Sequence, residues 1–154
     1  MAKLNEPNIE VKSIDANGVS IITKDKDIAN ARITFNNGLV ANLTASRLTS
    51  TPMRKFRLFQ EAQYISLDLQ NHKIELFNLV DKNTSQDIQS QFVNFGNKLI
   101  QLHNPIIKPL NAMDEEQKAF FNAIYNDKTT ACTLSEGAQA LKIAEKISDI
   151  IGNL

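Results

Sequence analysis

The sequence has few of the residues that small proteins commonly use for cross-links or phosphate loops. Its 154 residues include one cysteine, Cys132, and only five glycines. A single cysteine excludes an internal disulfide framework and a zinc site built from cysteines. Neither Gly-x-Gly-x-x-Gly nor Gly-Lys-Ser/Thr occurs in the chain. The sequence therefore indicates no self-contained nucleotide site.

Net charge and long apolar runs are missing as well. Seventeen Lys and Arg residues balance seventeen Asp and Glu residues, so the chain lacks the basic surface that a nucleic-acid binder needs. No apolar run approaches the ~20 residues of a membrane helix, and the N-terminus has no apolar signal core. A chain of this length can bury one core. We expect a single cytoplasmic domain over residues 1–154, with no nucleic-acid or membrane partner.

Residues 27–47 alternate between apolar and polar side chains with the period of two half-buried strands. A three-residue turn with Gly38 in the left-handed region would pair Ile33 with Ala41 and keep the apolar side chains together. A two-residue turn would instead place Ile33 opposite Asn42. We therefore predict an antiparallel hairpin with the three-residue turn.

Residues 53–69 form a second predicted hairpin that turns at Glu61 and Ala62 and pairs Leu58 with Ile65. The opposite face would carry the cross-strand pairs Phe59–Tyr64, Arg57–Ser66 and Lys55–Asp68. The two hairpins together predict an antiparallel sheet with one apolar face and one mixed face.

Three other stretches complete the predicted sheet. Residues 73–80 alternate as a further strand. Residues 9–14 and 19–22 flank Asn17-Gly18, which we interpret as a short turn between two strands. Asn and Gln are frequent in residues 82–104, where we predict an excursion within the domain with one or two extra strands.

The last third of the chain has the period of amphipathic helices. Apolar residues from Met113 to Ile124 share one helical face. A second helix is predicted to begin after Thr133, with Glu136 completing a capping box, and to end at Gly152. Strands followed by helices predict the α+β class: an open, predominantly antiparallel sheet with two C-terminal helices packed on one face.

Two histidines and the cysteine are the obvious candidates for chemistry. His72 lies at a predicted turn and His103 lies in the Asn/Gln-rich excursion, so we interpret both as exposed turn residues. Cys132 directly precedes a predicted helix. No base lies near it in the sequence, and we interpret it as structural. The sequence clusters no metal ligands.

The mixed face of the predicted sheet combines aromatic, hydroxyl and charged side chains. Such a face is either a solvated surface or a contact surface. We favour association, and we predict a homodimer or higher homo-oligomer through this face. The predicted interface residues are Thr44, Ser46, Arg57, Phe59, Tyr64, Ser66 and Phe77.

One block of sequence resembles a known family. Residues 27–47 read Asp-Ile-Ala-Asn-Ala-Arg-Ile-Thr-Phe-Asn-Asn-Gly-Leu-Val-Ala-Asn-Leu-Thr-Ala-Ser-Arg. They resemble the central strands of the C-terminal domain of the Gfo/Idh/MocA family of NAD(P)-dependent sugar and inositol oxidoreductases. Residues 53–68 and 120–141 continue the resemblance, which covers residues 9–151. It implies a fold like the C-terminal domain of dihydrodipicolinate reductase.

Members of this family have two domains, and the chain resembles only the second. In the family, an N-terminal Rossmann domain binds the cofactor. The C-terminal domain shapes the substrate pocket and commonly mediates subunit pairing. The resemblance therefore implies NAD or NADP in a full-length parent, and no catalytic, cofactor-binding or metal-binding residue in this chain. Asn5-Glu6-Pro7 lacks the lysine of the family's Glu-Lys-Pro motif.

The family's Asp-x-x-x-His pair has a match by spacing alone, at Asp68 and His72. In the family this pair precedes the first sheet strand, on a helix that enters the catalytic cleft. Here it falls at a strand end after the diagnostic block, and we reject the match.

We therefore hypothesise that the chain is the substrate-binding and oligomerisation domain of such an oxidoreductase, and that it is not catalytic alone. The parent would transfer a hydride between NAD(P) and a hydroxyl of a sugar, nucleotide sugar or polyol. Arg47 and Arg54 are candidates for contacting this substrate, because a guanidinium suits phosphate or carboxylate groups. The alternative is that both are sheet-edge charges. A second hypothesis is a stand-alone, non-catalytic binding or dimerisation module derived from the same domain.

Overall fold

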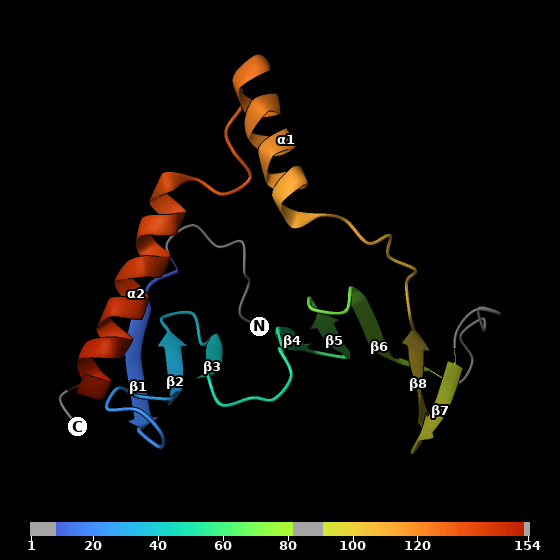
Figure 1. Ribbon diagram of the computed structural model, residues 1–154. Coiled ribbons are helices and arrows are strands. Elements are labelled where there is room, and N and C mark those ends of the chain that lie inside the picture. Colours follow the sequence, from blue (N-terminus) through green and yellow to red (C-terminus); the bar gives the residue numbers. More distant parts are fainter. Residues whose placement is uncertain (1–8, 82–90, 153–154) are drawn as a thin grey trace. The chain divides into compact units, whose positions relative to one another are not determined.

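The computed structural model describes residues 9–81 and 91–152, which form two compact units (Figure 1). The first unit comprises residues 1–49 and 113–154, and the second comprises residues 50–112. Each unit contains an antiparallel sheet, and the first also contains both helices. The predicted α+β class is therefore confirmed. Neither described helix is long and apolar enough to cross a membrane.

The sheet of the first unit has three strands in the order β1 (Val11–Val19), β2 (Ile28–Phe35) and β3 (Val40–Ser46). Ile33 pairs with Ala41, which confirms the predicted register of the hairpin. The three-residue turn is confirmed too. Gly38 has a φ of 84°, which a residue without Cβ adopts without strain.

The prediction of a turn at Asn17-Gly18 is wrong, because β1 continues through both residues. Asn17 pairs with Asn30 and Gly18 pairs with Ala29. The glycine has a packing role instead: a Cβ at this position would lie 2.5 Å from Cγ2 of Ile151. Gly18 therefore lets a helix approach the strand closely.

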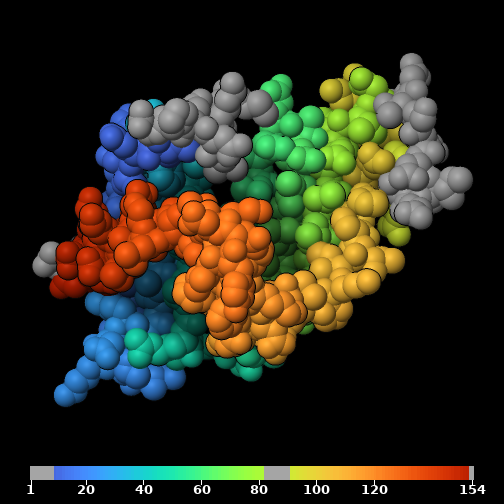
Figure 2. All heavy atoms as spheres, turned by 90° about the horizontal axis from the view of Figure 1, so that it is seen from above, coloured from blue at the N-terminus to red at the C-terminus, as the bar shows by residue number. Residues whose placement is uncertain are grey.

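That helix is α2 (Leu134–Gly152), which packs against β1. Figure 2 shows atoms of the helix, in red, beside those of the first strand, in blue. Ile151 on α2 and Ala31 and Ile33 on β2 are buried. These small and branched side chains form the core of the first unit.

The predicted capping box at the start of α2 is confirmed. The N–H of Thr133 donates to the carboxylate of Glu136 at 2.8 Å, and the N–H of Glu136 donates to the Thr133 hydroxyl at 3.2 Å. The other helix, α1 (Ala112–Tyr125), buries only Ala123 among the described residues. Its large apolar side chains are more than half exposed: Met113, Phe120, Phe121, Ile124 and Tyr125.

The second unit is a five-stranded sheet in the order β4-β5-β6-β8-β7. Its strands are β4 (Lys55–Gln60), β5 (Gln63–Asp68), β6 (Lys73–Asp81), β7 (Gln91–Phe95) and β8 (Lys98–His103). Leu58 pairs with Ile65 and Phe59 with Tyr64, as predicted. Ala62 closes that hairpin in the left-handed region, with a φ of 57°. The predicted excursion over residues 82–104 contributes β7 and β8, and residues 82–90 lie outside the described part.

Candidate functional site

The most elaborate polar site of the first unit surrounds Asp27, in the loop between β1 and β2. Its carboxylate Oδ2 accepts hydrogen bonds from three consecutive backbone N–H groups, those of Ile21 and Ile22 at 2.7 Å and that of Thr23 at 3.0 Å. Its Oδ1 accepts one from the Thr23 hydroxyl at 2.8 Å. The side chain of Asp27 is fully buried, with 0% relative exposure. One carboxylate thus fixes the conformation of the whole loop.

These donors stabilise the ionised form of Asp27. The backbone N–H groups of Thr23, Ile22 and Ile21, with the Thr23 hydroxyl, hold the pKa of this carboxyl well below its ordinary value. Burial acts in the opposite direction and is outweighed. A buried, negatively charged group therefore persists at neutral pH beside the end of β3.

Arg47, a predicted substrate-binding residue, lies directly beside this carboxylate. Its Nε is 3.7 Å from Oδ1 of Asp27. Its Nη2 donates to the backbone carbonyl of Lys26 at 3.1 Å. The Arg47 side chain is nevertheless 55% exposed, so one edge of the guanidinium is anchored and the other faces solvent.

Arg54, the second predicted substrate-binding residue, belongs to the other unit. Its backbone carbonyl accepts a hydrogen bond from the N–H of Leu69 at 2.8 Å. Its exposed side chain forms no ion pair or hydrogen bond with the described residues. The anchoring seen at Arg47 is therefore not repeated at Arg54.

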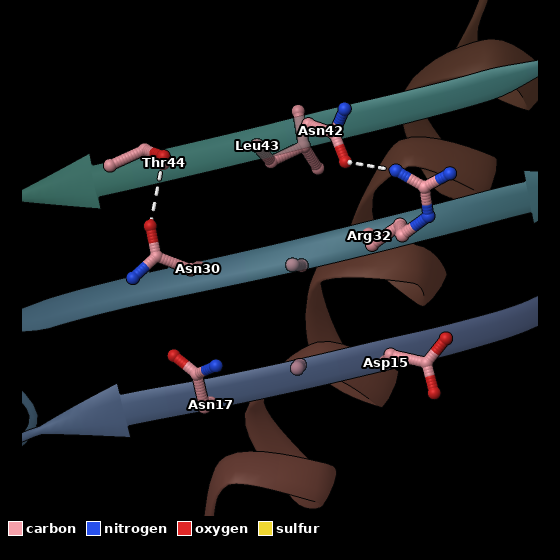
Figure 3. Close-up of a pocket in the computed structure, with 9 residues that line it drawn as sticks. Asp15, Asn17, Asn30, Arg32, Asn42, Leu43 and Thr44 are labelled. Carbon is pink, nitrogen blue, oxygen red and sulfur yellow. Dashed lines mark hydrogen bonds between the residues drawn. The ribbon is translucent and has the colours of Figure 1, made fainter.

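The face of the first sheet away from α2 carries two polar rows, which line a shallow groove of about 400 Å³ (Figure 3). The first row contains Asp15, Arg32 and Asn42, and the second contains Asn17, Asn30 and Thr44. The guanidinium of Arg32 donates to the Asn42 side-chain oxygen at 3.1 Å, and the Thr44 hydroxyl donates to that of Asn30 at 2.9 Å. These side chains are exposed. Two predicted interface residues, Thr44 and Ser46, belong to this strand face.

The other predicted interface residues form a continuous row on the second sheet. Phe59, Tyr64 and Phe77 occupy adjacent positions on β4, β5 and β6. Their rings stack with centroid separations of 4.6 Å and 5.1 Å. Phe59, on the edge strand β4, is 76% exposed. Arg57 and Ser66 pair in the neighbouring row of the same face.

Charged residues continue this second face beyond Arg57 and Ser66. Lys55 pairs with Asp68 across β4 and β5, and their charged atoms are 3.9 Å apart. The side-chain amide and backbone N–H of Asn71, together with the charge of Lys55, lower the pKa of Asp68. The face therefore combines a stacked aromatic row with an ionised row.

The remaining sequence candidates show no convergent chemistry. Asp68 accepts hydrogen bonds from the backbone N–H groups of Gln70 and Asn71, so it caps the turn in which His72 lies. The interpretation of His103 as an exposed turn residue is wrong: it is half-buried in β8, paired with Leu76. The thiol of Cys132 is free and exposed. The described residues contain no group of three His, Cys, Asp or Glu side chains that could hold a metal ion.

Sequence reasoning missed Asp27 and its loop. We predicted a strand over residues 19–22, whereas β1 ends at Val19. A signal was present, because the hydroxyl of a Thr four residues before an Asp can donate a hydrogen bond to its carboxylate. Ile21 and Ile22, which precede this Thr, favour a strand and led to the wrong prediction.

The chain matches a curated enzyme over part of its length. It is 40% identical over 68 residues to UDP-N-acetylglucosamine 3-dehydrogenase of Acidithiobacillus ferrooxidans, which is 44% of this chain and 22% of that enzyme. Two solved structures of UDP-N-acetylglucosamine 3-dehydrogenase GnnA from the same organism, in P21 and P212121 forms, have TM-scores of 0.78 and 0.75. Both are 26% identical to this chain. No protein-family model matches the sequence.

The coverage of these matches is asymmetric. The structural match includes 93% of this chain but only 42% and 41% of the two enzyme chains. The chain thus spans less than half the length of the enzyme that it resembles. It is homologous to part of this nucleotide-sugar dehydrogenase.

Proposed function

We propose that this chain is the C-terminal substrate-binding and oligomerisation domain of a nucleotide-sugar dehydrogenase. The full-length parent transfers a hydride between NAD or NADP and a hydroxyl of the nucleotide sugar. The observation that carries this proposal is the structural match over 93% of the chain at a TM-score of 0.78 to an enzyme named for UDP-N-acetylglucosamine. The nicotinamide cofactor binds in the part of the enzyme that this match does not cover.

In this proposal the chain supplies recognition and the remainder of the enzyme supplies chemistry. The nicotinamide accepts the hydride, and an acid/base group beyond these residues moves the proton. Arg47 binds the substrate through its phosphates, because a guanidinium presents several N–H donors in one plane. Arg54 is a separate candidate for such a contact. The exposed edge of Arg47 supports this role.

Assembly is the second part of the proposal. The row of Phe59, Tyr64 and Phe77 forms an interface with a second copy of the chain, and Arg57 and Ser66 border it. The stacked aromatic row, which ends in the exposed ring of Phe59, supports this assignment, since aromatic residues and arginine are enriched in interface centres. Thr44 and Ser46 are separate proposed contacts with a second copy, on the polar face of the first sheet.

A chimeric enzyme tests the catalytic part of this proposal. The segment of the Acidithiobacillus ferrooxidans dehydrogenase that the structural match covers is replaced by residues 9–152 of this chain. We expect the chimera to oxidise UDP-N-acetylglucosamine in an NAD(P)-dependent reaction. The absorbance of the reduced nicotinamide measures the rate. A rate loss of up to about 100-fold is acceptable, because small misplacements of substrate cost that much.

The controls separate a failed fold from a failed function. The cofactor half of the dehydrogenase alone should show no turnover. A chimera that is folded and binds nicotinamide, but oxidises no UDP sugar, would contradict the proposal. That result would favour the stand-alone binding or dimerisation module.

A further inference from the structure

We propose that Asp27 is a positioning residue that holds Arg47 and the loop of residues 20–26 as a preformed edge for binding a phosphate of the nucleotide sugar. This inference rests on the proposed function, in which Arg47 contacts the substrate. It adds a buried carboxylate and a loop that sequence reasoning missed.

The first step is that the carboxylate is already saturated by its own loop. Oδ2 of Asp27 accepts three backbone N–H groups, and Oδ1 accepts the Thr23 hydroxyl. Four donors leave little capacity for a bidentate pair with an arginine. The Nε of Arg47 accordingly stays at 3.7 Å, which is an ion pair without a hydrogen bond.

The second step is that the Arg47 guanidinium is held in one position although no carboxylate forms a hydrogen-bonded ion pair with it. Nη2 of Arg47 donates to the carbonyl of Lys26, while more than half of the side chain is exposed. The backbone is fixed at the same point, because the N–H of Arg47 donates to the carbonyl of Asp27 at 3.0 Å. The N–H of Asp27 in turn donates to the carbonyl of Val19 at 2.8 Å. Arg47 is thus oriented through both its main chain and its side chain.

The third step concerns what such an edge can bind. A guanidinium with outward N–H donors suits a phosphate, which accepts two parallel hydrogen bonds. Lys24 and Lys26 of the same loop are exposed and add positive charge, against one exposed carboxylate, Asp25. Because the loop is already ordered, binding requires little further loss of conformational entropy.

Arg32 provides a matched control within the same unit. It is an exposed arginine on β2, and its guanidinium donates to the amide oxygen of Asn42. No described carboxylate lies within ion-pair distance of it. If any exposed arginine of this unit sufficed for phosphate binding, Arg32 and Arg47 would behave alike.

The experiment is an NMR titration of the intact chain with UDP, pyrophosphate and uridine as probes. The Nε–H resonances of Arg47 and Arg32 are followed in protein labelled at arginine side chains. We expect UDP and pyrophosphate to shift Arg47 but not Arg32, and uridine to shift neither. Arg47→Ala should weaken UDP binding by about 10-fold or more, the usual effect of losing a charge-assisted hydrogen bond. Arg32→Ala should leave UDP binding unchanged.

Asp27→Asn tests the positioning role itself. We expect weaker UDP binding and a broadened Arg47 Nε–H resonance, while arginine remains present. If this variant does not fold, Thr23→Val replaces it, because it removes one of the four donors and keeps the charge. We expect that variant to weaken UDP binding by a smaller factor. A folded Asp27→Asn or Thr23→Val protein that binds UDP like the wild type would overturn the positioning role.

Failure of this inference and failure of the proposed function are distinguishable. If UDP does not shift the Arg47 Nε–H resonance, the proposed phosphate-binding role of Arg47 is wrong, even if the chimeric enzyme is active. An inactive chimera with a UDP-dependent shift at Arg47 overturns the dehydrogenase role and leaves the phosphate edge standing.

Discussion

Gly18 determines how closely the first strand and the last helix approach each other. The space for a side chain at Gly18 is occupied by Cγ2 of Ile151, which is itself buried. An isoleucine branches at Cβ and has few rotamers, so it cannot easily swing away. The absence of one methyl group therefore sets the contact between β1 and α2.

Gly18→Ala is expected to lower the free energy of unfolding by about 1–3 kcal/mol, the usual cost of overpacking a core. The matched control is Gly137→Ala in α2, where an added Cβ would meet no neighbour within 4 Å beyond its own stretch of helix. That change should raise stability by up to about 1 kcal/mol through helix propensity. Urea unfolding measures both. Equal effects of the two substitutions would show that the Ile151 contact is unimportant.

At the scale of elements, α2 begins with a reciprocal cap that also responds to pH. The backbone N–H and hydroxyl of Thr133 lower the pKa of Glu136 below its ordinary value of 4.5. A carboxyl with a lowered pKa in the folded state contributes stability above its ordinary pKa. That contribution is lost as the pH falls through the folded-state value.

Thr133→Ala should therefore destabilise the chain by about 1 kcal/mol at pH 7, as is typical of a lost helix cap. We expect a smaller cost at a pH low enough to protonate Glu136, because its hydrogen bonds with Thr133 are then already weakened. Thermal unfolding at the two pH values measures the difference. Ser135→Ala serves as the control. Ser135 is the second residue of α2, and its substitution should change stability by less than about 0.5 kcal/mol. The same cost at both pH values would argue against a role for the carboxylate.

The elements that could be predicted from sequence are those fixed by neighbours in the chain. The Gly38 turn, the turn at Ala62 and the Thr133 cap each depend on contacts within a few residues. The role of Gly18 was misread because the residue that requires a glycine there, Ile151, is 133 positions away in the sequence. The Asp27 loop was missed because its local sequence also fits a strand. Nothing in that pattern shows that the Asp27 carboxylate accepts hydrogen bonds from the N–H groups that precede it.

At the scale of the whole molecule, the proposed interface predicts self-association in solution. Phe59→Glu should shift sedimentation at micromolar concentration toward the monomer, because it places a charge at the exposed end of the aromatic row. Tyr64→Glu and Arg57→Glu should act in the same direction. Phe56→Glu is the matched control: Phe56 is also exposed on β4, but alternation places it on the opposite face.

Two results would count against the interface. A wild-type chain that sediments as a monomer would remove the proposed assembly. An associated chain that tolerates Phe59→Glu, Tyr64→Glu and Arg57→Glu would place the contact elsewhere.

The contact between β1 and α2 has a consequence for synthesis on the ribosome. Residues 50–112 form a continuous unit, whereas the other unit joins residues 1–49 to residues 113–154. The inner unit can close as soon as it emerges. The first three strands must wait for the final helix, so the earliest part of the chain to be translated is among the last to acquire its native packing.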